Sequence, residues 1–476
     1  MTLMGAAMGR AVVPVAVAGM LAGTMWMSCN GGNDGADPNE PGDPAGPEDN
    51  GPGDGNPPLF ELDPAFPEPP VIFLPAPPHD EEMEPPTLDP GAGMHSALTA
   101  EAIASLRSIA SRDPALREYA FAKIGDSHSV SSSFLQCFAE GGFDLGLHTH
   151  LLPAIGYFGV AAHEGVCSLG RESVATVAGI GAWGLMRDDP SLVEQELEAM
   201  RARFAVVMVG TNDACQGRVH NYVDNMLDMF DLLTRRGVIP LVSTLPPMAD
   251  DRHLHVRRFN AMLKAMVSLY GLPLVDLYEA MLPLPYMGLR SDGVHLSVDW
   301  NRGGGMAACT MSGSGLAYGA HVRNLLTLEQ LERARRSIIE GDVLDLEAEP
   351  RVGSGREEDP VHVDAMPFGE GLAARDSSWL PASELPVPCG ADWRQDLGMV
   401  YEVLVEEDTL LHAILHARGG ASGLVEIRAA GEASCVAGDE MEAVAEVAPG
   451  RYHVIIRQTP GYGGGGELLI GITSAP

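Results

Sequence analysis

The sequence contains few basic residues. It has 30 Lys and Arg against 65 Asp and Glu in 476 residues, which gives a formal net charge of −35 at pH 7. Nucleic-acid binding depends on neutralising phosphates with Lys and Arg, and adsorption to anionic lipid depends on the same side chains. The charge balance therefore argues against nucleic acid and against a lipid surface as partners.

The sequence also lacks an early apolar run long enough to cross a bilayer. Residues 11–27 form a run of 17 residues interrupted by Pro14, whereas a spanning helix needs about 20 apolar residues. With Arg10 before it, the run is typical of an export signal. The Ser and Cys29 that follow resemble the lipobox of bacterial lipoproteins, in which the Cys becomes the lipidated N-terminus. Cleavage of an ordinary signal with an incidental Cys is the alternative.

We therefore predict that residues 1–29 are a lipoprotein signal peptide and that Cys29 is the lipidation site. The protein is expected to be exported and anchored to a bacterial membrane through this lipid alone, facing the periplasm or the cell surface. Residues 30–92 contain no Lys or Arg and are dense in Pro, Gly and Asp. Such a segment cannot bury enough apolar surface to offset its ordering entropy, so a disordered tether is predicted.

Apolar runs alternate with helical patterns between residues 93 and 340. Five runs are predicted as strands: Tyr119–Gly125, Leu151–Phe158, Phe204–Val209, Val238–Leu245 and Leu272–Leu277. Strands that alternate with helices predict an α/β fold, in which a parallel five-stranded sheet is covered on both faces as a three-layer α/β/α domain.

The composition changes after residue 340. Residues 341–375 are acidic and irregular, which predicts a linker. Residues 376–476 contain short β-rich runs separated by Gly-rich turns, which predict a small all-β sandwich. This module has no aromatic platform that favours glycan binding.

Chemistry-bearing residues follow two of the predicted strands and one later loop. Ser127 comes two residues after the strand that ends at Gly125, and Asn212 follows the strand that ends at Val209. Asp292 precedes His295 by three residues, so its carboxylate can reach Nδ1–H and leave Nε2 free to accept a proton. A hydroxyl, an imidazole with its carboxylate and an amide donor are the parts that nucleophilic acyl transfer needs.

The Gly-Asp-Ser, Gly-Thr-Asn-Asp and Asp-x-x-His blocks, in this order, resemble those of the SGNH (GDSL-type) hydrolases over roughly residues 115–340. The resemblance implies a flavodoxin-like SGNH hydrolase fold and a serine esterase with the triad Ser127, Asp292 and His295. It also implies an oxyanion hole formed by the N–H groups of Ser127 and of a Gly in a second block, with the Asn212 amide. Gly179 is our prediction for that Gly, and Gly181 is the alternative.

Seven Cys residues are present, and six remain if the first carries lipid. An oxidising compartment then favours up to three disulfides. The predicted pairs are Cys137–Cys167, Cys215–Cys309 and Cys389–Cys435.

No catalytic role is predicted for several other polar residues near these blocks. Asp126 and Asp213 are expected to bond their own loops, and His128 is expected to point away from the site. His148 and His150 lack a third ligand at metal spacing, so neither a metal nor a cofactor is assigned.

Three functions remain open at this point. The first is a surface esterase, monomeric, that acts on small-molecule or glycan esters such as O-acetyl groups. The second is an O-acyltransferase on the same scaffold, and the third is a non-catalytic surface binding lipoprotein.

Overall fold

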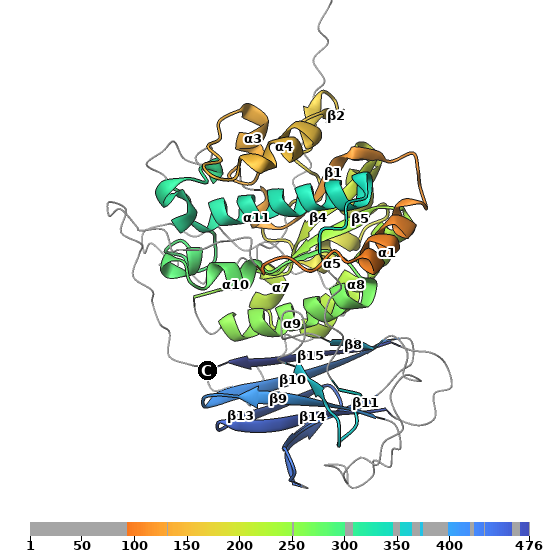
Figure 1. Cartoon of the computed structure of the whole chain (residues 1–476), viewed down its shortest axis with the longest axis vertical. Coiled ribbons are helices and arrows are strands. Elements are labelled where there is room, and N and C mark those ends of the chain that lie inside the picture. Colours follow the sequence, from red (N-terminus) through yellow and green to blue (C-terminus); the bar gives the residue numbers. More distant parts are fainter. Residues whose placement is uncertain are drawn as a thin grey trace, which may run out of the picture.

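The computed structural model describes an α/β domain and a β-sandwich that pack against each other (Figure 1). The described residues are 93–130, 132–249, 252–299, 308–345, 353–363, 372–374, 398–418, 423–432, 434–458 and 467–475. The predicted signal peptide and tether, with Cys29 and Cys389, lie outside these residues. None of the helices in the described part is long and apolar enough to cross a membrane.

The α/β domain is built on a parallel sheet of four strands. Their order is β1 (Arg117–Gly125), β4 (Ala202–Met208), β5 (Ile239–Ser243) and β6 (Leu274–Val275). Every residue of β4 is buried, as is typical of a strand whose sheet is covered on both faces. The predicted parallel α/β sheet is thus confirmed.

The predicted fifth strand is not present in the described sheet. The run Leu151–Phe158 was expected to be that strand, but it forms helix α4 (Leu152–Phe158), with Pro in its first turn. A short, mostly apolar run fits a buried strand or a buried helix equally well, and Pro favours the start of a helix. At the free edge of β1, the described chain makes one isolated bridge, between Gly125 and Thr176.

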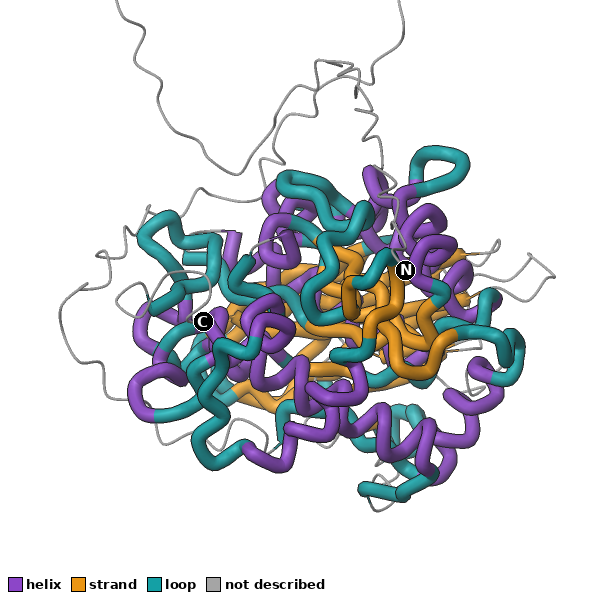
Figure 2. The backbone as a smooth tube through the Cα atoms, turned by 90° about the horizontal axis from the view of Figure 1, so that it is seen from above, coloured by secondary structure: helices purple, strands orange, loops and turns teal. Residues whose placement is uncertain are grey.

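Helices cover both faces of the sheet, and Figure 2 shows the strands at the centre with helices around them. One layer contains α1 (Ala100–Ala110), α4 and α11 (Gly319–Ala334), and the other contains α6 (Leu192–Met200), α8 (Val219–Arg235) and α9 (Arg252–Tyr270). Phe158 of α4 packs edge-to-face on Phe121 of β1 and Phe204 of β4, with ring centroids 5.6 and 6.0 Å away. These contacts bind α4 to the sheet.

The β-sandwich consists of two sheets with an apolar core between them. The first sheet contains, in order, β13 (Glu442–Val447), β10 (Thr409–Arg418), β15 (Glu467–Ala475) and β8 (Leu372–Ala374). The second contains β12 (Cys435–Asp439), β11 (Gly423–Ala429), β14 (Gly450–Gln458), β9 (Gly398–Val405) and β7 (Val361–His362). Two of these strands, β7 and β8, come from the stretch that was predicted as a linker.

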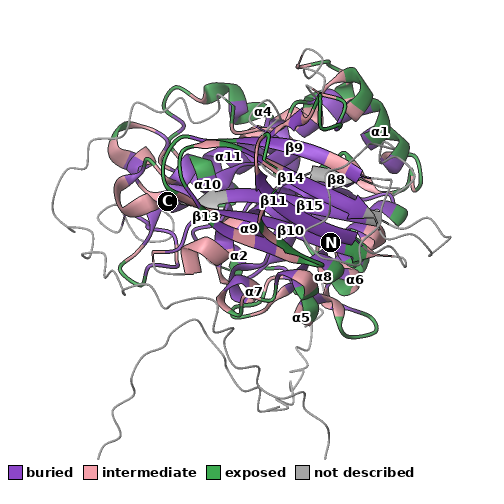
Figure 3. Ribbon diagram, turned by 90° about the horizontal axis from the view of Figure 1, so that it is seen from below, coloured by how far each residue is buried: buried purple, intermediate pink, exposed green. Residues whose placement is uncertain are grey.

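The first sheet of the sandwich packs on α9, and its strands are largely buried (Figure 3). Gly471 of β15 allows this close approach, because a Cβ there would lie 2.8 Å from Met262 Sδ. Ile414 and Leu469 join the core of the α/β domain, and Arg258 of α9 forms a 2.6 Å ion pair with Glu442. The two parts therefore share buried surface.

The disulfide pattern differs from the prediction. Cys137 is bonded to Cys309, so the predicted pairs Cys137–Cys167 and Cys215–Cys309 are both wrong, and Cys167 is a free thiol. Helix α3 (Gln136–Glu140) brings Cys137 beside the segment before α11, a proximity that spacing along the chain cannot reveal. The predicted Cys389–Cys435 pair includes a residue outside the described part.

Candidate active site

Ser127 lies where β1 ends and a short helix begins. It is the first residue of α2 (Ser127–Val130), two residues after the last residue of β1. Gly125 is required at this bend, because a Cβ there would collide with Ser129 Oγ and with the carbonyl oxygen of Met208. The strand, turn and helix thus hold the Ser127 hydroxyl at the carboxyl end of the sheet, where open α/β folds bind ligands.

Asp292 organises the turn that carries His295. Its Oδ1 accepts hydrogen bonds from the backbone N–H groups of Val294 and His295, both at 2.9 Å. Gly293 has a φ of +68°, and its carbonyl oxygen accepts a 2.9 Å bond from the N–H of Ala249. The turn is therefore closed internally and attached to the loop that follows β5.

The structure brings Ser127, His295 and Asp292 together. The Nε2 atom of His295 lies 3.1 Å from Ser127 Oγ, and Nδ1 lies 2.9 Å from Asp292 Oδ2. Burial acts to raise the pKa of Asp292, but hydrogen bonds from His295 and from two backbone N–H groups outweigh it and hold the pKa well below its usual range. Asp292 is therefore ionised at neutral pH and fixes the proton of His295 on Nδ1.

Asn212 lies in α7 (Thr211–Cys215), directly after β4, and is buried. Its Nδ2 donates to the carbonyl oxygen of Ile180 at 2.9 Å. An amide nitrogen has two hydrogens, so this bond sets the orientation of the amide and leaves the second N–H available to a ligand. The bond also joins Asn212 to the segment that contains Gly179 and Gly181.

Glycine is favoured at positions 179 and 181 for two different physical reasons. Gly179 has a φ of +77°, a conformation that favours Gly, and nothing lies within 4 Å of the position of an added Cβ. Gly181 is extended, but a Cβ there would lie 2.6 Å from Asp213 Oδ1. Asp213 Oδ2 accepts the N–H of Ala182 at 3.0 Å. Asp213 therefore bonds this segment in addition to its own backbone N–H, whereas only bonds within its own loop were expected.

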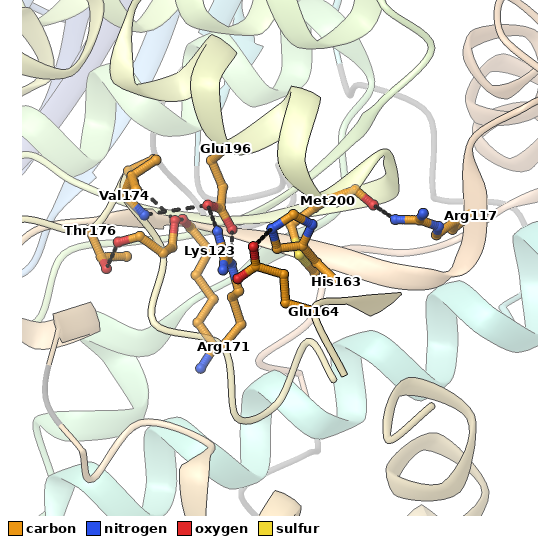
Figure 4. Close-up of polar contacts among 11 residues, drawn as sticks. Arg117, Lys123, His163, Glu164, Arg171, Val174, Thr176, Glu196 and Met200 are labelled. Carbon is orange, nitrogen blue, oxygen red and sulfur yellow. Dashed lines mark hydrogen bonds and ion pairs between the residues drawn. The ribbon is translucent and has the colours of Figure 1, made fainter. Parts of the chain in front are cut away.

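The segment that leads to Gly179 is anchored to β1 and α6. Arg171 makes two hydrogen bonds of 3.1 and 3.0 Å to the buried carboxylate of Glu196 (Figure 4). The N–H of Gly125 donates to the carbonyl oxygen of Ala175 at 3.0 Å. These bonds hold the segment beside the end of β1, close to Ser127.

Two further carboxyl groups lie in the loops of the site, of which Asp126 is fully buried and Asp213 is half-buried. Burial raises the pKa of Asp126, whose Oδ1 accepts the N–H of His128 at 3.1 Å within its own loop, as expected. Burial also raises the pKa of Asp213 to about 6, and the charge of Asp126 adds to this shift. Both groups support loops of the site.

A pocket of about 120 Å³ opens beside the triad. Its wall includes Ser127 and His295 and also His128, Phe134, Arg290 and Arg323. The expectation that His128 points away was wrong, since its ring centroid lies 5.4 Å from that of His295. Burial, followed by the charge of Arg323, lowers the pKa of His128 well below its ordinary value, so the ring is neutral.

Sequence reasoning missed the two arginines of this wall. Arg290 stands two residues before Asp292, so the Asp-x-x-His block could have pointed to it. Arg323 lies in α11 and reaches the pocket through helix packing, which no local signal reveals. In the part of the chain that the structure describes, no group of three or more His, Cys, Asp or Glu is placed to hold a metal ion.

Residues 159–302 match the model of the GDSL-like Lipase/Acylhydrolase family. This segment is therefore similar to serine hydrolases of the GDSL type, and we call the α/β domain the hydrolase domain. The matched segment of this hydrolase domain includes Gly179, Asn212, Asp292 and His295 but begins after Ser127. Ser127 is therefore placed in the candidate site only by its distance from His295 in the structure.

The chain is similar to several solved structures of low sequence identity. A GDSL-like lipase from Bacteroides thetaiotaomicron is 16% identical, with a TM-score of 0.29 and coverage of 49% of this chain and 99% of that chain. A catalytic mutant of an acetylxylan esterase from Geobacillus stearothermophilus is 15% identical, with a TM-score of 0.30 and coverage of 44% and 93%. A two-domain esterase active on acetylated mannans is 12% identical, with a TM-score of 0.28 and coverage of 79% and 96%. No curated protein matches the chain.

Proposed function

We propose that the hydrolase domain is a serine esterase that hydrolyses carboxylic esters, O-acetyl groups among them, with Ser127 as the nucleophile. The observation that supports this most directly is the 3.1 Å separation of Ser127 Oγ and His295 Nε2, with Asp292 on the other ring nitrogen at 2.9 Å. This is the hydrogen-bonded order of nucleophile, base and orienting group that acyl transfer requires.

In the proposed first step, Ser127 Oγ attacks the ester carbonyl and His295 Nε2 takes the hydroxyl proton. The imidazolium then gives this proton to the leaving alcohol, and an acyl group remains on Ser127. In the second step water attacks the acyl carbon and loses a proton to His295, which passes it to Ser127 Oγ as the bond to Ser127 breaks and the carboxylic acid leaves. The ionised Asp292 stabilises the imidazolium in both steps without itself becoming protonated.

The negative charge on the carbonyl oxygen would be stabilised by three donors. They are the backbone N–H groups of Ser127 and Gly179 and the second N–H of the Asn212 amide. The bond from Asn212 to Ile180 supports this role, because the amide is already oriented before substrate arrives. Donors that need no reorganisation contribute most to such stabilisation, and losing one typically costs about 10²–10³ in kcat.

We further propose that the esterase acts outside the cytoplasm as a monomer, held to a membrane by lipid on Cys29. The Cys137–Cys309 bond supports an oxidising compartment. Incorporation of radiolabelled palmitate into the wild type and not into Cys29→Ser would agree with the anchor. Equal labelling of both proteins would contradict it.

Hydrolysis by the purified enzyme tests the proposed activity. We expect release of nitrophenol from p-nitrophenyl acetate and of acetate from acetylated polysaccharide, and loss of both in Ser127→Ala. A surface serine such as Ser354 provides a control, and Ser354→Ala should retain full activity. Unchanged rates in Ser127→Ala would refute the assignment of the nucleophile.

A further inference from the structure

Arg323 is a buried cation in the wall of the catalytic pocket. It is 4% exposed, and its guanidinium donates to the carbonyl oxygen of His128 at 2.6 Å and to Ser129 Oγ at 2.9 Å. The guanidinium also lies 3.8 Å from the ring centroid of Phe134, which is another residue of the pocket wall. Its position is therefore fixed by two hydrogen bonds and a ring contact.

No carboxylate of the described chain lies within ion-pair distance of Arg323, and its bonds go to a carbonyl and a hydroxyl oxygen. Two other buried cations are paired: Arg258 lies 2.6 Å from Glu442, and Lys264 lies 2.8 Å from Asp276. Isolated buried charges are costly, so they are normally paired. Arg323 has no ion pair of this kind, and the buried carboxyl of Asp126 interacts with it only beyond ion-pair distance.

Arg203 provides a useful comparison, because it is also buried without an ion pair among the described residues. Its guanidinium donates to three backbone carbonyl oxygens, those of Ala110, Asp113 and Gly237, and it is not part of the pocket wall. Arg203 thus binds backbone groups away from the pocket, and its Nε is buried without a hydrogen-bond partner. Arg323 has fewer such bonds and borders the space that a substrate would occupy.

The rest of the pocket wall also carries positive and no negative side-chain charge among the described residues. Arg290 contributes a second guanidinium, and none of the described residues in the wall is Asp or Glu. This contrasts with the net charge of −35 of the whole chain. Burial lowers the pKa of Arg323 to about 9, so the guanidinium is still charged at neutral pH.

We propose that the pocket is an anion subsite that binds a carboxylate carried by the ester substrate, with Arg323 as the main contact and Arg290 as the second. The inference rests on the esterase function proposed above and names its substrate class. Ser127 and His295 belong to the same wall, so the carboxylate would lie a few bonds from the scissile ester. The volume of about 120 Å³ is below the roughly 150 Å³ of a cavity that binds benzene, so the group that enters is small.

The carboxylate could belong to the acyl group or to the alcohol, and matched substrates distinguish these sources. For the acyl side, the mono-p-nitrophenyl ester of glutaric acid is compared with its neutral amide analogue. For the alcohol side, O-acetyl lactate is compared with O-acetyl lactamide. A hydrogen bond to a charged group contributes about 1.5–3 kcal/mol, which corresponds to roughly a 10- to 100-fold preference in kcat/KM for the acid in one pair.

Variants test whether the preference depends on the arginines. Arg323→Gln should bring the acid-to-amide ratio close to one, and Arg290→Gln should reduce it in part. Arg236→Gln is the control, since Arg236 pairs with Glu194 and Glu198 elsewhere on the domain, and it should keep the ratio of the wild type. If Arg323→Gln does not fold, as judged by circular dichroism, the wild-type ratio and Arg290→Gln decide.

Equal hydrolysis of acid and amide in both pairs would overturn the anion subsite and leave the esterase function intact. Absence of hydrolysis with every ester would instead refute the proposed function. In that case, calorimetric titration with glutarate and glutaramide measures directly whether the pocket binds a carboxylate. Tighter binding of glutarate by the wild type than by Arg323→Gln would support the subsite, and equal binding of the two probes would overturn it.

Discussion

Asp292→Asn is the substitution that most sharply probes the arrangement of the triad. The amide oxygen of Asn can still accept the N–H groups of Val294 and His295, which Oδ1 accepts at 2.9 Å in the wild type. The turn should therefore keep its shape. The other position, 2.9 Å from His295 Nδ1, would now carry an N–H donor.

A donor at that position favours the His295 tautomer with its proton on Nε2, which cannot accept the proton of Ser127. In the well-studied Ser-His-Asp triad this change lowers kcat by about 10⁴. Here the side chains of Asp292 and His295 are 34% and 38% exposed, so solvent weakens the effect of the bond. We expect kcat for p-nitrophenyl acetate to fall by about 10³–10⁴, with KM changed little.

Stopped-flow and steady-state hydrolysis measure this directly, and thermal unfolding shows whether the turn is intact. Asp342→Asn is a suitable control, because Asp342 forms an exposed ion pair with Arg336, and it should leave kcat unchanged. An Asp292→Asn enzyme that is fully folded and retains a tenth or more of the wild-type kcat would refute the proposed role of the carboxylate.

Three further predictions concern other parts of the hydrolase domain. Asn212→Ala should lower kcat by about 10²–10³ and raise KM less; steady-state kinetics that show the reverse would remove Asn212 from the oxyanion hole. The pKa of Asp213 is raised to about 6 against about 3.9 when unfolded, so the unfolded state loses its proton first and stability falls as pH rises from about 4 to 6. The free energy of unfolding of Asp213→Asn should therefore exceed that of the wild type by up to about 3 kcal/mol above pH 6 and equal it below pH 4. Urea titrations above pH 6 and below pH 4 measure this difference. A difference that is the same at both pH values would contradict the prediction. Replacing Cys137 and Cys309 by Ser opens a loop with a sequence separation of 172 and should lower the free energy of unfolding by about 2–5 kcal/mol; an unchanged urea midpoint would contradict the bond.

The parts of the site that were predictable from sequence are local or follow from sheet geometry. Asp292 and His295 are three residues apart, so one turn suffices to join them. Ser127 and Asn212 each follow a buried parallel strand, and such strands end at one edge of the sheet. The contact of Ser127 with His295, which spans 168 residues, was therefore a reasonable hypothesis without coordinates.

The parts that were missed depend on packing between distant elements. Cys137 meets Cys309 because of the position of α3 relative to the segment before α11, and cysteine spacing does not encode that. Arg323 reaches the pocket from α11, where its neighbours in sequence show only a helical pattern. The helix α4 was mistaken for a strand, because a short apolar run carries no decisive period.

Labelling with a fluorophosphonate probe, followed by peptide mass spectrometry, tests the central claim most directly. The account predicts modification of Ser127, in proportion to the loss of esterase activity, and no modification in Ser127→Ala. Modification of a different serine, with hydrolysis preserved in Ser127→Ala, would contradict it.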